Sequence, residues 1–272
     1  MVMSADTSEA ACTECGAGED VERAAHSWAE AMTSLAAAAP GGHWRLGEGG
    51  AVLAVTGAPV AALNGVLNVA ARPDAAGIAE LAALAARELT TVPWSIQIRG
   101  EPTTGIVEVA GHYGMTVRSQ QPFMLRPFTG NEPTPPRGAS VKVRRATGSD
   151  HKVLSAALAA GFAVPQHVFT EVASPTVMAA AGMTAYLAEA EGTAVATGTA
   201  AVFQDCVGLF NISTLPPFRG RGYARVMTER ILREGRAMGA RAAYLHTTEA
   251  GRRLYESLGF RTVGQWTTFS AP

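Results

Sequence analysis

A proline- and glycine-rich stretch near the middle of the chain limits how the rest can fold. Residues 128–138 read FTGNEPTPPRG, and three prolines with two glycines in so short a run favour an extended linker over a helix or strand. The linker leaves two segments of similar length, each within the usual size of a domain. We therefore predict a flexible tail at residues 1–20, a first domain at 21–128, a linker at 129–140 and a second domain at 141–272.

The overall composition is that of a chain with a hydrophobic core and no strong charge. Hydrophobic residues make up 47% of the 272 residues and charged residues 17%, which excludes a disordered chain. The formal net charge of −1 gives no electrostatic reason to expect a nucleic acid or an anionic membrane as partner. The N-terminus lacks the apolar core of a signal peptide, and no uninterrupted apolar run of about 20 residues occurs. We expect a cytoplasmic protein that binds neither nucleic acid nor membrane.

The three cysteines do not suggest a metal site. Cys12 and Cys15 form a lone C-x-x-C pair in the polar leader, and Cys206 stands alone. A zinc site would need two further ligands at matching spacing, and we find none. We therefore predict reduced thiols and no bound metal.

The second segment alternates strand and helix patterns. Strands show alternating or continuous apolar residues, and helices show apolar residues three and four positions apart. The predicted order is β-α-α-β-β-β-α-β-α-β, which is typical of an α/β fold with a mixed sheet covered by helices. The expected strands are 141–145, 185–190, 193–203, 206–214, 241–247 and 261–269, and the expected helices are 153–161, 167–172, 223–238 and 249–258.

The first segment gives a fainter version of the same pattern. We expect helices at 21–38, 75–89 and 105–113, strands at 51–55 and 94–98, and a further short segment at 63–67. The sequence HYGMTV at 112–117 is similar to SLGFRTV at 257–263. This similarity indicates a diverged internal duplication.

The most informative motif is LPPFRGRGYA at residues 215–224, between a predicted strand and a strongly amphipathic helix. Glycines let backbone N–H groups approach a bulky anion without obstruction by a Cβ atom. The following helix directs its unpaired amides and the positive end of its dipole to the same point. Arg219 and Arg221 add positive charge that suits phosphate oxygens. The loop therefore predicts a diphosphate site.

The same loop resembles a family signature. Arg219 to Ala224 match the Arg/Gln-x-x-Gly-x-Gly/Ala motif of the GNAT superfamily of acyl-CoA N-acyltransferases, and LYESLGF at 254–260 is also similar to that family. The resemblance covers residues 141–269 well and residues 20–128 only as a degenerate copy without the glycine signature. It implies a tandem protein of two GNAT-like domains, with the C-terminal one intact.

The resemblance implies roles for particular residues. The strand ending at Ile212, Ser213 and Thr214 would pair with the pantetheine arm of acetyl-CoA and splay away from the strand at 241–247. A backbone N–H near Ser213 would stabilise the oxyanion, and Tyr255 would protonate the departing thiolate. The pyrophosphate would lie on the amides of Arg219, Gly220, Arg221, Gly222, Tyr223 and Ala224.

The general base and the acceptor site are less defined. His246 is one candidate base, Glu249 and Asn211 lie nearby in the sequence pattern, and deprotonation through water is an equal alternative. In the GNAT family, the region around Phe162 and His167 walls the acceptor pocket. Glu189 is the acid that we expect to face a cationic acceptor.

These features predict transfer of an acetyl group from acetyl-CoA to a primary amine of a small molecule, with aminoglycoside-type antibiotics as one family-level analogy. A protein N-terminal or lysine acetyltransferase is the alternative within the same class. A non-catalytic acyl-CoA-binding module is the alternative outside it. The sequence leaves the oligomeric state open and allows a homodimer.

Overall fold

A computed structural model describes residues 6–129 and 141–272, with side chains described from residue 18 onward. Nearly all of the predicted linker at 129–140 lies outside these residues. The prediction of a mixed α/β fold is confirmed: in the described chain, 11 strands form one mixed sheet in the order β1-β2-β3-β4-β11-β5-β10-β9-β8-β7-β6. The strands are β1 (His43–Leu46), β2 (Ala51–Val55), β3 (Asn64–Asn68), β4 (Ser95–Arg99), β5 (Val117–Pro127), β6 (Lys142–Arg145), β7 (Met183–Ala190), β8 (Thr193–Phe203), β9 (Cys206–Thr214), β10 (Ala242–His246) and β11 (Arg261–Ser270).

The two segments exchange strands at the centre of this sheet. Strand β5 of the first segment lies between β10 and β11 of the second, and it pairs antiparallel with both. Strand β11 of the second segment in turn pairs antiparallel with β4 of the first. The halves are thus connected by an unbroken hydrogen-bonded ladder. Neither half can be removed without exposing strand edges that the other half now covers.

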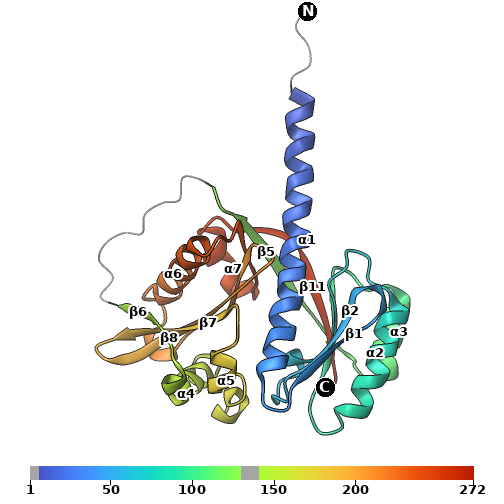
Figure 1. Cartoon of the computed structure of the whole chain (residues 1–272), viewed down its shortest axis with the longest axis horizontal. Helices are drawn as coiled ribbons and strands as arrows, with labels where there is room; N and C mark the ends of the chain where they lie inside the picture. The colour runs from blue at the N-terminus through green and yellow to red at the C-terminus, as the bar shows by residue number, and fades with distance from the viewer. Residues whose placement is uncertain (1–5, 130–140) are drawn as a thin grey trace, which may run out of the picture.

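Helices cover both faces of the sheet (Figure 1). Helices α6 (Tyr223–Ala237) and α7 (Glu249–Glu256) cover one face of the second half, and α4 (His151–Phe162) and the short α5 (Pro175–Met178) cover the other. In the first half, α2 (Ala75–Glu88) and α3 (Thr104–His112) pack on one face and α1 (Asp6–Ala38) on the other. No helix in the described part of the chain is long and apolar enough to cross a membrane.

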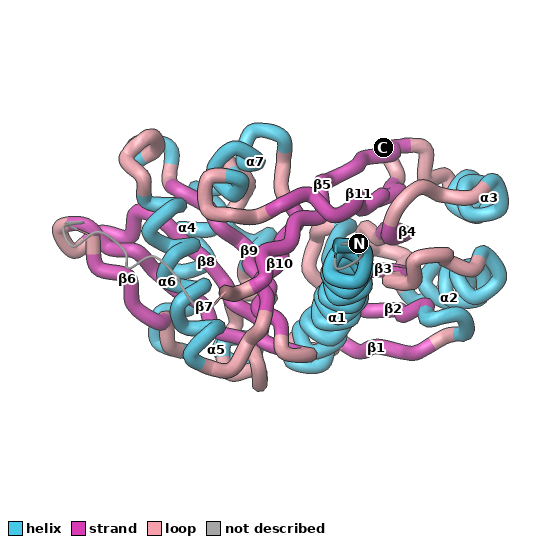
Figure 2. The backbone as a smooth tube through the Cα atoms, turned by 90° about the horizontal axis from the view of Figure 1, so that it is seen from above, coloured by secondary structure: helices cyan, strands magenta, loops and turns pink. Residues whose placement is uncertain are grey.

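Helix α1 lies across the junction between the halves, as Figure 2 shows from above. Its buried side chains form one core cluster with Val52 and Leu67 of the first half and with Cys206 and Tyr244 of the second. The helix begins at Asp6, so residues 6–20 are helical where we expected a flexible tail. The helical pattern from Val21 onward continues backwards through alanines and acids that form helices readily.

Several predicted elements agree with the structure, and others were missed. The helices and strands of the second segment agree to within a few residues, except that the second predicted helix is a short 3₁₀ helix at Gln166–Phe169 followed by α5. Strands β1 and β5 were not predicted. β5 contains Pro122 and Pro127 and exposes its first five residues, so neither an alternating pattern nor a continuous apolar run is visible.

Candidate functional site

Strands β9 and β10 diverge in the second half. They pair in parallel only from Ala242↔Cys206 to Tyr244↔Gly208, although β9 continues to Thr214 and β10 to His246. The last residues of β10 keep their other edge paired with β5, with His246 opposite Phe123. The free edge of β9 therefore forms one side of the gap. An extended molecule with amide groups can pair with this edge as a further strand would.

A bulge shapes the free edge of β9. Residues Asn211 and Ile212 together oppose one residue of β8, and Asn211 has a left-handed φ of 54°. Beyond the bulge, the N–H of Leu215 donates to the carbonyl of Val195 at 3.0 Å. Alternate residues of an antiparallel strand direct their N–H groups to the same side, so the N–H of Ser213 also points toward β8.

The same alternation directs the backbone N–H of Thr214 toward the gap, whereas Ile212 lies in the bulge itself. Ser213 itself turns its N–H away from the gap, and the oxyanion donor near Ser213 stays a prediction. Its side chain is also engaged, because its hydroxyl lies 2.8 Å from that of Thr197. The bulge shifts the alternation by one residue, and the sequence motif alone does not reveal this shift.

The loop between β9 and α6 exposes a series of free amides. Gly220 and Gly222 have φ values of 76° and 80°, and a Cβ atom added to either would meet nothing within 4 Å. The first helical hydrogen bond of α6 runs from the N–H of Val226 to the carbonyl of Gly222, and no side chain caps the helix. In the described chain, no intramolecular acceptor takes the N–H groups of residues 220–225. This is the geometry of an anion site at a helix N-terminus.

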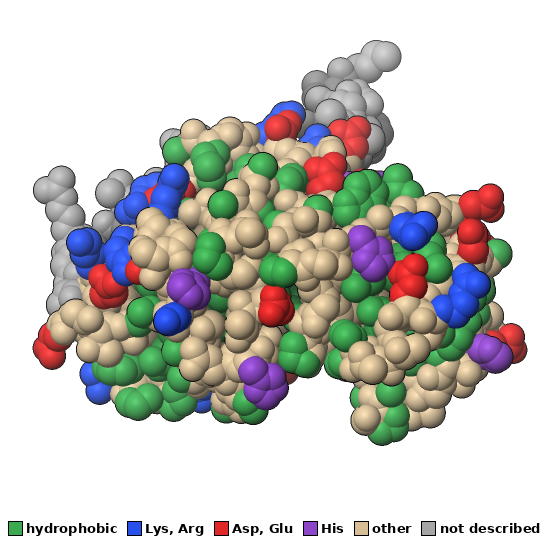
Figure 3. Space-filling view, turned by 60° about the horizontal axis from the view of Figure 1, so that its bottom comes forward, with side chains coloured by type: hydrophobic (Ala, Val, Ile, Leu, Met, Phe, Trp, Pro, Cys, Tyr) green, Lys and Arg blue, Asp and Glu red, His purple; other side chains and the backbone are tan. Residues whose placement is uncertain are grey.

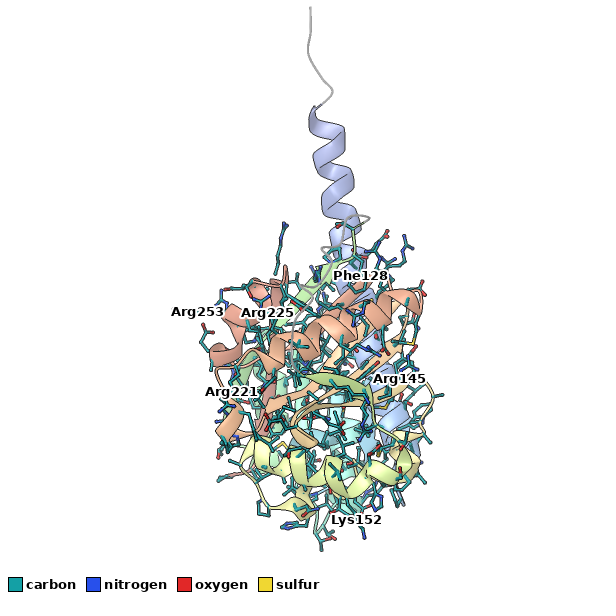
Figure 4. All side chains as sticks on the ribbon, turned by 90° about the vertical axis from the view of Figure 1, so that its left-hand side faces the viewer. Phe128, Arg145, Lys152, Arg221, Arg225 and Arg253 are labelled. Atoms are coloured by element: carbon teal, nitrogen blue, oxygen red, sulfur yellow. The ribbon has the colours of Figure 1, made fainter. Side chains whose placement is uncertain are left out.

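Arginines surround these amides. Figure 4 shows Arg221, Arg225 and Arg253 on one side of the molecule, near the N-terminal end of α6. Arg219 has a structural role instead: it donates to the carbonyls of Thr214 at 3.2 Å and Gly161 at 2.9 Å. It thereby connects the end of β9 to the end of α4 and fixes the loop.

The corresponding region of the first half has neither free N-terminal amides nor a gap between its strands. The N-terminal amides of α2 at Ala76 and Gly77 are capped by the carboxylate of Asp74, at 3.3 and 2.9 Å. This carboxylate occupies the anion position and would repel a phosphate. Strands β3 and β4 also remain paired with each other as far as the pair Asn68↔Ile98, where β3 ends. No gap therefore opens between them. Among the described residues, only the second half combines an open gap with free amides.

Tyr255 lies on the α6 face of the sheet. Its ring is 8% exposed and packs edge-on against Phe260, with 5.8 Å between the ring centroids. It belongs to the same core cluster as Leu209 and Leu245, the residues at which β9 and β10 begin to diverge. Burial raises the pKa of the Tyr255 hydroxyl to about 12, so it stays protonated at neutral pH.

His246 lies on the opposite face, because successive residues of a strand alternate. Its ring contacts those of Trp28 at 5.4 Å, Phe123 at 5.1 Å and Trp266 at 4.8 Å between centroids. Its Nε2 atom is buried and has no hydrogen-bond partner in the described structure. This aromatic setting desolvates the imidazole and lowers its pKa to about 3. Such an imidazole is neutral at physiological pH but is a very weak base.

Glu249 and Asn211 are the other two candidate bases. The Glu249 side chain is 79% exposed and pairs with Arg252 at 3.5 Å at the start of α7. Asn211 carries an amide that does not accept a proton at neutral pH. Its side chain does line a cavity on the α1 face of the sheet, next to the point where the strands diverge.

This cavity lies beneath α1. It has a volume of about 80 Å³ and reaches from Phe210 and Asn211 at the diverging strands toward α4 and α5. Helix α1 contributes Ala31, Met32 and Leu35. None of its lining residues carries a charge. Sequence patterns gave no sign that α1 would contribute to it, because that helix belongs to the other segment.

The predicted acceptor residues lie elsewhere. The Phe162 side chain is 45% exposed and contacts the cavity only through Phe169, with 5.5 Å between their rings. His167 is exposed on the 3₁₀ helix outside the cavity lining. Glu189 pairs with Arg144 at 2.7 Å on β7, near the edge of the sheet. Arg144 also pairs with Asp150, and Glu189 does not line the cavity, so its role toward a cationic acceptor stays a prediction.

The described residues contain no group of three or more His, Cys, Asp or Glu side chains that could hold a metal ion. Cys206 is buried, and burial raises the pKa of its thiol to about 11. A thiol with that pKa is a poor nucleophile at neutral pH.

Residues 160–260 match the Acetyltransferase (GNAT) family. This part of the chain is a GNAT domain. It contains the diverging ends of β9 and β10, the free amides at α6 and Tyr255. The sequence matches no curated protein.

Two solved structures share the fold of most of the chain, and a third covers less of it. A GCN5-related N-acetyltransferase from Kribbella flavida is 19% identical, with a TM-score of 0.66 over 93% of this chain and 95% of that one. A GNAT-family protein from Novosphingobium aromaticivorans DSM 12444 is 19% identical, with a TM-score of 0.56 over 83% and 89%. The aminoglycoside N-acetyltransferase AAC(6')-Iy in complex with CoA is 20% identical, with a TM-score of 0.40 over 47% and 92%.

Proposed function

We propose that the chain is an N-acetyltransferase that moves an acetyl group from acetyl-CoA to a primary amine of a small molecule. One observation carries the proposal: a gap between two diverging parallel strands opens beside the uncapped N-terminus of α6. The free amides of residues 220–225 suit the pyrophosphate of acetyl-CoA. The free edge of β9 suits the amides of its pantetheine arm.

The residues at the gap fit direct transfer without a covalent enzyme intermediate. The amine nitrogen attacks the thioester carbonyl carbon, and the carbon–sulfur bond then breaks to give an amide and a thiol. The N–H group of Thr214 faces the gap and is suited to stabilise the oxyanion. The proton lost by the nitrogen balances the proton gained by the sulfur.

Tyr255 is suited to assist the departing sulfur. Its pKa of about 12 is above that of a thiol, which is about 8 to 9, so complete proton transfer to a thiolate would be uphill. We propose that the hydroxyl donates a hydrogen bond to the thiolate as it forms. With His246 so weakly basic, the amine loses its proton through water or binds as the free base.

Calorimetry with CoA tests this proposal, with matched substitutions at the two ends of α6. Gly222→Asp brings a carboxylate to the free amides and should weaken CoA binding by about tenfold or more. Gly239→Asp is the control: Gly239 also has positive φ and open space, at the other end of the helix. The control should suffer similar backbone strain but bind CoA as the wild type does.

Thiol release from acetyl-CoA in the presence of amines completes the test. Turnover with a small primary amine supports the proposal. CoA binding without any thiol release would favour a non-catalytic binding module, and release only with peptides would favour a protein acetyltransferase. Absence of any heat of CoA binding would end the proposal.

A further inference from the structure

The cavity beneath α1 has the composition of a site for an apolar group. Its wall combines Ala31, Met32 and Leu35 of α1 with Leu154 and Leu158 of α4. Thr199 and Asn211 bring the polar side chains of its lining, and both come from the sheet at the β9 bulge. The wall of the cavity is therefore polar at the β9 bulge, beside the gap between β9 and β10, and apolar elsewhere.

We infer that the acceptor is a primary amine with one apolar chain or ring, which lies in this cavity against α1 while its nitrogen points to Asn211. This inference rests on the proposed function and adds the class of substrate. An apolar group gains free energy when it leaves water for such a cavity. A volume of about 80 Å³ is several times the roughly 15 Å³ that a single water molecule needs.

The charges of the described residues argue against a polycationic acceptor. An ammonium group in an apolar cavity needs a carboxylate or other hydrogen-bond acceptors to offset its desolvation. No carboxylate lines the cavity, and Glu189 and Asp150 both pair with Arg144. On the face seen in Figure 3, acidic side chains are scattered among apolar and uncharged ones and form no continuous patch.

The first half of the chain would then select the substrate. Ala31, Met32 and Leu35 recur three and four residues apart, so they lie on one face of α1. One turn earlier on the same face, Trp28 contacts His246. Helix α1 thus presents a single apolar stripe that runs from the aromatic contacts of His246 into the cavity.

A series of amines tests the inference. We expect kcat/KM, measured by thiol release, to rise about fourfold per added methylene from ethylamine to hexylamine until the cavity is full. Spermidine and kanamycin should be no better than ethylamine. Faster acetylation of spermidine or kanamycin than of hexylamine, or no dependence on chain length, would overturn the inference and leave the proposed function intact.

Two substitutions connect the selectivity to the cavity. Ala31→Leu places three more carbons in the cavity, so it should reduce the advantage of hexylamine over ethylamine by at least about tenfold. Leu35→Ala enlarges the cavity and should move the optimum to a longer amine. CoA binding should be unchanged in both variants, because neither residue touches the loop at α6.

Leu81→Ala provides the matched control. Leu81 is buried on α2 of the first half and does not line the cavity. This variant loses stability as Leu35→Ala does but should keep the wild-type ratio of hexylamine to ethylamine. An unchanged ratio in Ala31→Leu, or an equal change in Leu81→Ala, would show that the cavity does not hold the acceptor. Thiol release with no amine at all would instead overturn the proposed function.

Discussion

Replacing His246 with phenylalanine should remove an acid-sensitive part of the free energy of unfolding. The imidazole is surrounded by the rings of Trp28, Phe123 and Trp266, none of which titrates. Its folded-state pKa is about 3, whereas an unfolded histidine has a pKa of about 6.5. Between these two values the unfolded state binds a proton that the folded state does not.

The sign and size of the effect follow from this difference. Stability is complete above pH 6.5 and falls as the pH drops, by at most about 1.4 kcal/mol per pH unit. From pH 7 to pH 5, His246 alone should lower the free energy of unfolding by about 2 kcal/mol. At pH 7 the phenylalanine variant should be as stable as the wild type or up to about 1 kcal/mol more stable, because it removes the unpartnered Nε2.

Urea denaturation of both proteins at pH 7 and pH 5 measures the effect. Other titrating groups contribute equally to both proteins, so the difference between their pH dependences isolates His246. The wild type should lose about 2 kcal/mol more than His246→Phe over this interval. If the two proteins lose the same amount to within about 0.5 kcal/mol, the imidazole is not desolvated in the folded protein and the reasoning fails.

The low pKa of His246 also predicts how kcat/KM depends on pH. Since a base with a pKa of about 3 contributes little to deprotonation of an alkylamine, kcat/KM should keep rising with pH as the free amine accumulates toward its pKa of about 10. A plateau above pH 7 that the phenylalanine variant lacks would restore His246 as the general base. It would also show that bound substrate raises its pKa.

Two further predictions concern Tyr255 and Gly161. Tyr255→Phe should lower kcat about 100-fold and leave CoA affinity unchanged by calorimetry; equal turnover by the variant would exclude the hydroxyl from the reaction. Gly161→Ala should lose about 1 to 3 kcal/mol in urea denaturation, because the added Cβ atom would lie 2.2 Å from the Ser213 hydroxyl oxygen. Gly111→Ala on α3 meets nothing within 4 Å and should gain up to about 1 kcal/mol; a gain in both variants would show that α4 does not approach Ser213 so closely.

Local signals made the coenzyme side of the site predictable from sequence. The glycines at 220 and 222 adopt the left-handed conformation that their residue type permits. The apolar stripe of α6 likewise depends on residues within one helix, so its position and bounds could be predicted closely. Each of these features depends on neighbours a few residues apart.

The proposed acceptor side could not be predicted, because distant parts of the chain come together there. Trp28, Phe123, His246 and Trp266 come from four elements, and no local pattern relates them. The ion pair of Glu189 was missed for a related reason. Its partner Arg144 lies on a neighbouring strand 45 residues away, and the pairing of β6 with β7 sets their contact.

The exchange of strands explains why the GNAT domain would need the first half of the chain. A gap between β9 and β10 leaves Leu245 and His246 without partners on the β9 side. Those residues still pair with Met124 and Phe123 of β5 on their other side. Strand β5 therefore holds the end of β10 in place while β9 diverges from it. Because the first half supplies this strand and the α1 wall, the proposed site would require it even though its own helix α2 has capped N-terminal amides.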